Sequence, residues 1–421
     1  MQKKLLILAS LIFIQLNDQH VRAQGIIVSA AGPVNRSMGG AATAAPIDAL
    51  GAIYWNPATI TQLPSNEMEM GLDLLFANHT VRSSFGPFQG ETQGEAGVFP
   101  IPNVGWVHKC QNPNITLGLG VNGVAGFKTN LNADPTNPIL APPPIGLGRV
   151  SSEASFMQLA PVLALQLTDT VSVAVGPTIT TGQLGVEPFV FNDPNSNGMY
   201  PSGRATRYHW GAGFQVGAFY KPNESWQHGI SFKSPTWMET FEFYGIDAAG
   251  SPRALSADID LPLILSVGTA YTAFERWLFA LDLRYFDYTN TNGLGDPASF
   301  SSTGSLQGLG WDSIFATAVG AQYQWNDRIS LRSGYTFNQN PISNQESFFN
   351  VASPLVYQHM LSSGASLAVS ESTSCHFAYS YMFENSRSGP LHAPGIGAIP
   401  GSNVDNILDG HFLSFGVSLR H

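Results

Sequence analysis

One segment of the sequence matches the first half of a calcium-binding loop in the spacing of its possible ligands. In residues 193–198, oxygen-bearing side chains stand at the first, third and fifth positions and a glycine stands at the sixth, as in an EF-hand loop. The twelfth position, where that loop requires a bidentate Glu, is Arg204. We therefore interpret the segment as an Asx turn in an exposed loop and expect no bound metal.

Hydrolytic chemistry finds little support in the sequence. There is no Gly-x-Ser-x-Gly motif to present a nucleophilic serine. His359 and His376 fall on predicted strands, and nothing in the sequence places a nucleophile beside either of them. We interpret both as lumen, interface or turn-end residues, and we expect no catalytic residue and no cofactor.

Three charged residues are at inward-facing positions of their predicted strands. They stand out because only 11% of the residues in the chain are charged. They are Asp282, Arg284 and Arg332. Two interpretations stay open. These side chains form an ion-pair network that braces the interior or holds another segment there, which we favour, or they contact a carboxylate on a substrate.

The overall composition is unusual for a soluble domain, in which about a quarter of residues are charged. The 421 residues include 43 Gly and 26 Phe, and aromatic residues make up 11%. Low charge with abundant Gly and aromatic residues is typical of a lipid-facing β-barrel. The formal net charge of −10 argues against a nucleic-acid partner, because a phosphate backbone needs clustered Lys and Arg.

The N-terminus has the pattern of a secretory signal peptide. Lys3 and Lys4 precede an apolar run over residues 5–14, and residues 21–23 form a small-residue cleavage pattern. The run is too short for a membrane-spanning helix, and no cysteine follows it to accept lipid. We predict that residues 1–23 are a signal peptide cleaved near Ala23 and that the protein is exported to the bacterial outer membrane.

Segments of alternating polarity from residue 66 to residue 421 predict an all-β domain of antiparallel strands. Short connections alternate with long ones rich in Gly, Pro, Asn and Ser, which is the pattern of a transmembrane barrel of about fourteen strands with its short turns in the periplasm. A soluble β-sandwich is the alternative, since its strands also alternate. The predicted short turns are 110–114, 168–170, 221–225, 273–276, 326–328 and 370–374, and the long loops are 77–100, 125–153, 183–205, 236–258, 290–310, 338–355 and 386–410.

Aromatic residues near both ends of the strands favour the barrel, because membrane barrels carry aromatic girdles at the two interfaces. Trp277 and Tyr323 flank short turns. The residues assigned to the other girdle are Tyr285, Tyr288, Trp311, Tyr335 and Tyr357.

Cys110 and Cys375 fall at short-turn ends three strand spacings apart, roughly 14 Å. This distance is beyond the reach of a disulfide, so we predict two free thiols.

Residues 24–65 do not alternate. A Gly/Ala run that begins at Gly39 and Gly40 is broken by Pro46, and Asn56 precedes Pro57. Ala-rich stretches favour helix, and a residue before Pro is pushed out of the helical region, so we expect two short helical pieces with a sharp bend. Such a segment is either a free periplasmic tail or a hatch inside the lumen. We favour the hatch, because about fourteen strands enclose more space than side chains fill.

This segment resembles the N-terminal hatch signature of the FadL family, the outer-membrane transporters of long-chain fatty acids and aromatic hydrocarbons. The resemblance rests on residues 35–41 (NRSMGGA) and 48–58 (DALGAIYWNPA), and later on 282–288 (DLRYFDY), 319–323 (VGAQY) and 331–335 (LRSGY). It implies a fourteen-stranded barrel with a hatch and passive uptake of hydrophobic compounds. The hatch-motif residues are Gly39, Gly40, Asp48, Asn56, Pro57 and Ala58.

The sequence also suggests where a hydrophobic substrate could leave sideways into the bilayer. Glycines mark bulges and close backbone approach, and Pro removes a hydrogen-bond donor from a strand. Pro177 in the fifth strand is one candidate, and the third strand, which the resemblance favours, carries the others: Gly118, Gly120, Gly123 and Gly126. We hypothesise that movement of the hatch around Asn56 and Pro57 is coupled to an opening there.

Two other functions stay open at this level, a general diffusion porin and a structural or adhesive barrel whose long loops bind a partner. The expected partners of the leading hypothesis are hydrophobic small molecules, fatty acids or hydrocarbons, and the lipid of the outer membrane. We expect a monomer.

Overall fold

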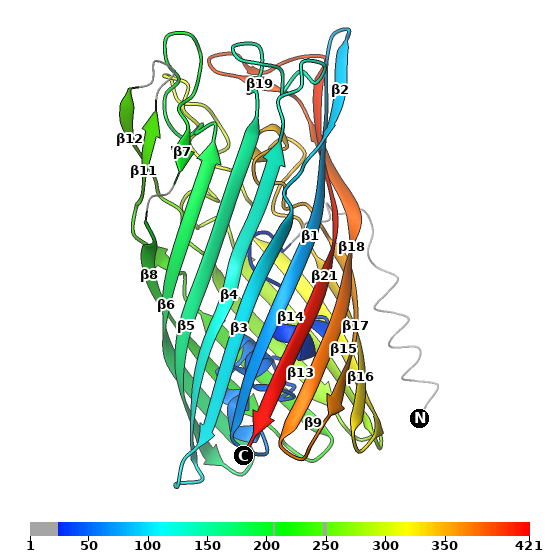
Figure 1. Ribbon diagram of the computed structural model, residues 1–421. Coiled ribbons are helices and arrows are strands. Elements are labelled where there is room, and N and C mark those ends of the chain that lie inside the picture. Colours follow the sequence, from blue (N-terminus) through cyan, green and yellow to red (C-terminus); the bar gives the residue numbers. More distant parts are fainter. Residues whose placement is uncertain (1–23, 205–206, 247–250) are drawn as a thin grey trace.

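The computed structural model describes residues 24–204, 207–246 and 251–421, so the predicted signal peptide lies outside the described residues. Its main feature is a closed antiparallel barrel of 14 strands, which confirms the predicted fold (Figure 1). The barrel closes where β1 (Glu67–Phe85) pairs with β21 (Ser402–Arg420). The strands between them are β3 (Val98–Lys109), β4 (Ile115–Leu131), β5 (Val150–Thr168), β6 (Val171–Glu187), β8 (His209–Tyr220), β9 (Trp226–Lys233), β13 (Leu263–Tyr271), β14 (Trp277–Asp287), β15 (Ile314–Asn326), β16 (Ile329–Asn338), β17 (His359–Ala368) and β18 (Thr373–Gly389).

All the predicted short turns lie between consecutive barrel strands at the end where the C-terminus lies (Figure 1). Several of the predicted long loops begin too early, because the strands before them are longer than expected: β1 reaches Phe85, β4 reaches Leu131 and β18 reaches Gly389. Polar residues on these strand ends suit a sheet that extends beyond the bilayer. The loops carry the short strands β2 (Phe88–Gln93), β7 (Gly203–Arg204), β10 (Trp237–Met238), β11 (Phe241–Ile246), β12 (Pro252–Ala257), β19 (His392–Ala393) and β20 (Gly397–Ala398), and the 3₁₀ turn η2 (Phe348–Asn350).

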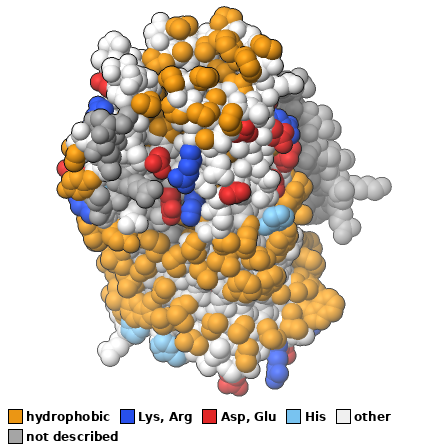
Figure 2. All heavy atoms as spheres, turned by 45° about the horizontal axis from the view of Figure 1, so that its top comes forward, with side chains coloured by type: hydrophobic (Ala, Val, Ile, Leu, Met, Phe, Trp, Pro, Cys, Tyr) orange, Lys and Arg blue, Asp and Glu red, His pale blue; other side chains and the backbone are white. Residues whose placement is uncertain are grey.

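The two faces of the strands differ as the alternation predicts. On β14, Leu281 is 41% exposed, whereas its neighbours Ala280 and Asp282 are buried in the lumen. Such outward apolar side chains form a band round the barrel (Figure 2). One part of the girdle prediction is wrong, because Tyr288, Trp311 and Tyr357 are buried in the lumen. Tyr288 and Trp311 pack edge to face and Tyr288 donates to the Gln24 carbonyl, so these aromatic residues cover the start of the hatch.

Residues 24–62 lie inside the barrel and form the hatch, with its helices in the half nearer the short turns (Figure 1). There are three helical pieces rather than two: α2 (Gly32–Ser37), α3 (Ala49–Trp55) and the 3₁₀ helix η1 (Pro57–Gln62). The Ala-rich stretch 41–45 is not helical. Gly39 and Gly40 adopt positive φ and end α2, and Pro46 follows before another helix can form. α2 contacts β1, β16, β17, β18 and β21, and η1 contacts β4, β5, β6 and β8.

Two of the irregularities in the wall lie on the strands that the sequence analysis singled out. The pairing of β4 with β5 shifts register between Gly123 and Ala125, which leaves Val124 as the extra residue of a β-bulge. Between β5 and β6 the pairs Leu159–Ile179 and Leu163–Val175 keep one register on either side of Pro161 and Pro177. The two prolines therefore face each other, and neither can donate to the ladder. No helix among the described residues has the length and hydropathy of a membrane span.

Candidate functional site

The first turn of α3 is held by three carboxylates. Asp48 caps the helix and accepts from the Gly51 amide at 2.9 Å. Glu67 and Glu69, from the start of β1, accept from the first two amides of the helix, those of Ala49 and Leu50, at 3.1 and 3.3 Å. Negative groups stabilise a helix N-terminus, where amides lack partners within the helix. Burial raises the pKa of Asp48 to about 6.

Asn56 and Pro57 form the bend between α3 and η1, and Asn56 is extended at φ −148°, as expected before Pro. The Asn56 side chain joins three segments. Its Oδ1 accepts from the Ala58 amide at 3.2 Å, and its Nδ2 donates to the carbonyls of Thr43 and Ala218 at 2.8 and 3.0 Å. The bend is therefore tied both to the hatch and to β8 of the wall.

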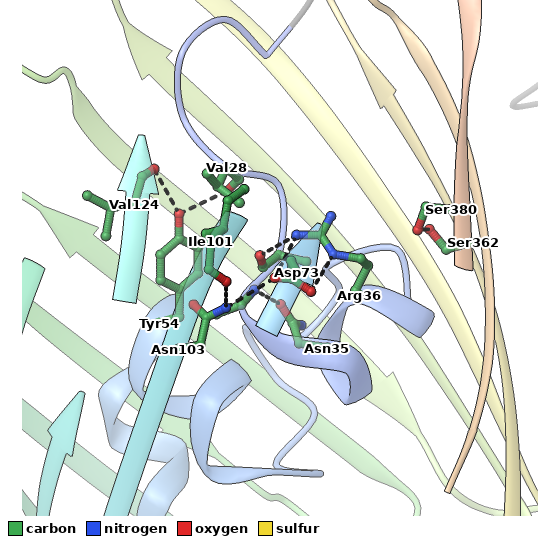
Figure 3. Close-up of polar contacts among 12 residues, drawn as sticks. Val28, Asn35, Arg36, Tyr54, Asp73, Ile101, Asn103, Val124, Ser362 and Ser380 are labelled. Atoms are coloured by element: carbon green, nitrogen blue, oxygen red, sulfur yellow. Dashed lines mark hydrogen bonds and ion pairs between the residues drawn. The ribbon is translucent and has the colours of Figure 1, made fainter. Parts of the chain in front are cut away.

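A buried ion pair links α2 to β1 (Figure 3). The Arg36 guanidinium donates from Nε and Nη2 to the Asp73 carboxylate, at 3.1 and 3.0 Å. Asn103 of β3 also donates to that carboxylate, and the Phe412 ring lies 4.0 Å from the guanidinium carbon. The charge of Arg36 is thus balanced by Asp73 and covered on one face by Phe412.

Of the three charged residues predicted to face the lumen, two hold the hatch. Asp282 Oδ2 accepts from the amides of Ala42 and Thr43, at 2.9 and 3.0 Å, and from Arg284 at 2.7 Å. Arg284 also donates to the Gly40 carbonyl and lies 3.4 Å from the Trp55 ring centroid. Arg332 is buried nearer the short turns, where it donates to Gln322 and Ser366.

The first residues of the hatch run beside the bulge of β4. Ile27 forms an antiparallel bridge with Ala125. The Val28 amide donates to the Val124 carbonyl at 2.9 Å, and the Gly126 amide donates to the Ile26 carbonyl at 3.2 Å. Tyr54 donates its hydroxyl to the Val28 carbonyl at 2.8 Å (Figure 3). Residues 26–28, which we call the gate segment, therefore cover the bulge from inside.

A mostly apolar cavity with room for about 60 Å³ lies against the gate segment; it is smaller than the sites that usually hold small molecules. Its lumen-facing ionisable side chains among the described residues are Tyr357 and His79, and His79 Nε2 lies 3.3 Å from Asn406 Oδ1. Lys128 also borders the cavity, but its ammonium group reaches Glu153 at 3.6 Å on the outer face. The apolar lining includes Ile26, Val28, Ile101, Phe127, Leu355 and Phe412.

The candidate glycines of the wall do not form one group. Gly118 and Gly120 face the hatch, because a Cβ on them would meet Ile60 at 3.1 Å and Ile53 at 2.8 Å respectively. A Cβ on Gly123 or Gly126 would instead meet side chains of β3, Ile101 or Phe99, and Gly126 alone of the four borders the cavity. The sequence analysis missed the gate segment, whose one signal was an apolar triplet, Ile26 to Val28, ahead of the helices.

The other candidates for chemistry have structural partners. Asn195 forms an Asx turn by accepting from the amides of Asn197 and Met199, and Thr303 donates to Asp193. His376 lies between Ser366 and Ser418. Cys110 and Cys375 are free thiols.

Comparisons with known proteins agree with this arrangement. The structure of the toluene transporter TodX of P. putida is 16% identical in sequence, with a TM-score of 0.69 over 93% of this chain and 99% of TodX. A Pseudomonas aeruginosa FadL homologue is 15% identical, with a TM-score of 0.71 over 94% of this chain and 99% of the homologue. These likenesses show the fold.

In sequence, the chain is 20% identical over 188 residues to the long-chain fatty acid transport protein of Escherichia coli K12, a match that covers 41% of this chain and 42% of that relative. The profile of the family described as outer membrane protein transport protein (OMPP1/FadL/TodX) matches residues 19–393. The chain therefore belongs to this family of outer-membrane transport proteins.

Proposed function

We propose that this protein is a passive channel for hydrophobic small molecules, fatty acids or hydrocarbons, and that its gate segment closes a lateral exit at the β4 bulge. One observation carries the proposal: the gate segment lines the apolar cavity and is hydrogen-bonded to the bulge. Displacement of the segment would join the cavity to an irregular part of the wall. A hydrophobic molecule could then enter the bilayer without crossing water.

The filled lumen supports this function over the alternatives. The hatch is almost wholly buried from Gln24 to Thr61, whereas a general diffusion porin needs an open, water-filled pore. An adhesive barrel would need no gate. The proposal covers both substrate classes because one similar protein is named for long-chain fatty acids and another for toluene.

A disulfide across the gate tests the proposal. Ile27 and Ala125 form a narrow, non-hydrogen-bonded pair, in which Cα atoms are about 4.5 Å apart, within disulfide range. We would introduce Ile27→Cys and Ala125→Cys together with Cys110→Ser and Cys375→Ser. Oxidation should stop uptake of toluene and of oleyl alcohol by cells that produce the variant, and dithiothreitol should restore it.

The matched controls are the two single-cysteine variants, which should import both compounds under either condition. Unchanged uptake in the fully cross-linked protein would exclude the gate segment as the moving part. Equal uptake by cells with and without the wild-type protein would overturn the transport function itself.

A further inference from the structure

The wall of the cavity beside the gate segment contains polar atoms that lack hydrogen-bond partners. His79 of β1 and Thr129 of β4 border the cavity and are 3% and 1% exposed. Neither His79 Nδ1 nor Thr129 Oγ1 has a hydrogen-bond partner in the described part of the chain. Tyr357, which is also buried, brings a third polar group to the same lining. Buried polar atoms without partners are costly, so this part of the wall is suited to a polar group of a ligand.

His79 and Thr129 lie at the same level of the barrel, on two strands that residues 94 and 95 join. The Gly94 amide donates to the His79 carbonyl at 2.7 Å. The next amide, that of Glu95, donates to the Asn130 carbonyl at 2.7 Å. A Cβ on Gly94 would lie 3.2 Å from the first carbonyl oxygen and 3.3 Å from the second. The side chains of His79 and Thr129 therefore enter the lumen from neighbouring positions, within reach of one ligand group.

The hydrogen bonds of Asn406 determine which kind of group His79 presents to the cavity. The Asn406 Nδ2 donates to the carbonyl and the hydroxyl of Ser347, at 2.7 and 3.1 Å. Its Oδ1 is therefore the acceptor that faces His79 Nε2 at 3.3 Å, and Nε2 carries the hydrogen. In a neutral imidazole the other nitrogen, Nδ1, is then an acceptor.

A ligand group that suits this wall donates to His79 Nδ1 and accepts from a hydroxyl. The hydroxyl of an alcohol or a phenol does both. A carboxylate only accepts, and the ammonium group of Lys128 at the border of the cavity reaches Glu153 on the outer face instead. A plain hydrocarbon would leave the polar atoms of the wall unpaired. The remaining lining is mostly apolar, which suits an apolar body on the same ligand.

We propose that His79 and Thr129, with Tyr357, form a polar subsite that selects hydrophobic molecules with one neutral hydroxyl group, such as alkylphenols, over plain hydrocarbons and carboxylates. This inference rests on the proposed function and names its substrate class. The closed cavity has room for about 60 Å³, less than the roughly 150 Å³ of a cavity that binds benzene. An aromatic ring therefore enters only when the gate segment, which forms one side of the cavity, moves away.

The test compares p-cresol with toluene, which has the same ring and methyl group without the hydroxyl. Equilibrium dialysis against the full chain in lipid nanodiscs, with empty nanodiscs as the blank, gives both affinities at pH 8, where an imidazole is neutral. The wild type should bind p-cresol about tenfold more tightly than toluene, because two neutral hydrogen bonds contribute about that factor. His79→Leu should remove most of this preference and Thr129→Val should reduce it about threefold to fivefold, with toluene affinity unchanged in both.

Thr116→Val is the matched control, because Thr116 is a buried threonine on the lumen face of the same strand and does not border the cavity. It should keep the preference of the wild type. An unchanged preference in both His79→Leu and Thr129→Val would overturn the subsite and would mean that the two polar groups bind water instead. Equal weakening of both ligands would also overturn it, because the effect would then be one of packing. Toluene uptake by cells that produce Thr129→Val tests the transport function separately, since loss of the p-cresol preference leaves toluene transport unchanged.

Discussion

Asn56 shows how a single side chain fixes the hatch to the wall. Both of its amide hydrogens are used, one on Thr43 within the hatch and one on Ala218 of β8. No other residue type of this size supplies two donors and an acceptor at once. Gly217 of β8 leaves space for this side chain, because a Cβ at that position would overlap the Asn56 amide oxygen.

Replacement of Asn56 by Asp removes both donors and leaves a buried carboxylate against two carbonyl oxygens. We expect Asn56→Asp to weaken hatch docking by about 2–5 kcal/mol. Arg36 is the only tryptic site in the hatch and is buried, so its cleavage by trypsin reports opening and should accelerate on the order of a hundredfold. The control Asn223→Asp keeps its turn-capping oxygen and should behave as the wild type. Cleavage at the wild-type rate in Asn56→Asp would exclude an anchoring role.

At the scale of elements, the hatch is held more firmly at its helices than at its gate segment. The helices are held by the carboxylates on α3, the Arg36 ion pair and the Asn56 bonds. The gate segment is joined to β4 by a single bridge, which consists of two backbone hydrogen bonds. Local opening draws on the least stable contacts, so the gate segment is expected to move while the helices stay in place.

Deletion of residues 26–58 separates the barrel from its hatch. The lumen is then lined by inward polar groups such as Asp73, Asp282 and Arg284, and a barrel of this width without a plug conducts ions. We expect the truncated protein to raise single-channel conductance in planar bilayers well above the level of the full chain and to lose selectivity for apolar compounds. Heat-modifiable migration on gels confirms that the barrel has folded. A folded but electrically silent barrel would mean that the hatch does not close the lumen.

Alternation and turn composition were enough to predict the barrel elements, because one face of each strand meets lipid and the other the lumen, as in β14. Alternation did not predict the positions of Tyr288 and Trp311, which fold inward over the hatch. Both lie in a loop above the bilayer, where side chains do not alternate regularly between two faces. Alternation also did not single out Lys233. That residue shares the inward parity of Gly229 and Ser231, but only the structure shows that its ammonium group packs on the Tyr54 ring of the hatch.

At the scale of the whole molecule, the outward apolar band fixes the depth of the barrel in the bilayer (Figure 2). Leu281 lies within it and is 41% exposed. We expect Leu281→Arg to lower the free energy of unfolding by about 2–4 kcal/mol, because the charge would enter hydrocarbon. Ser172→Ala on the lumen face loses one bond to Thr61 and should cost about 1 kcal/mol. Urea titrations in lipid vesicles measure both, and equal costs would contradict the assignment of the faces.

The hatch contacts strands from both ends of the chain, and this constrains the order of assembly. α2 touches β1 and β21, which meet at the closing seam, while η1 touches β4, β5, β6 and β8 on another part of the wall. A hatch that contacts the wall on several sides in this way is more easily enclosed by the strands than inserted into a finished barrel. We therefore infer that in the full chain the N-terminal segment lies inside the half-formed sheet before the last strand docks on the first.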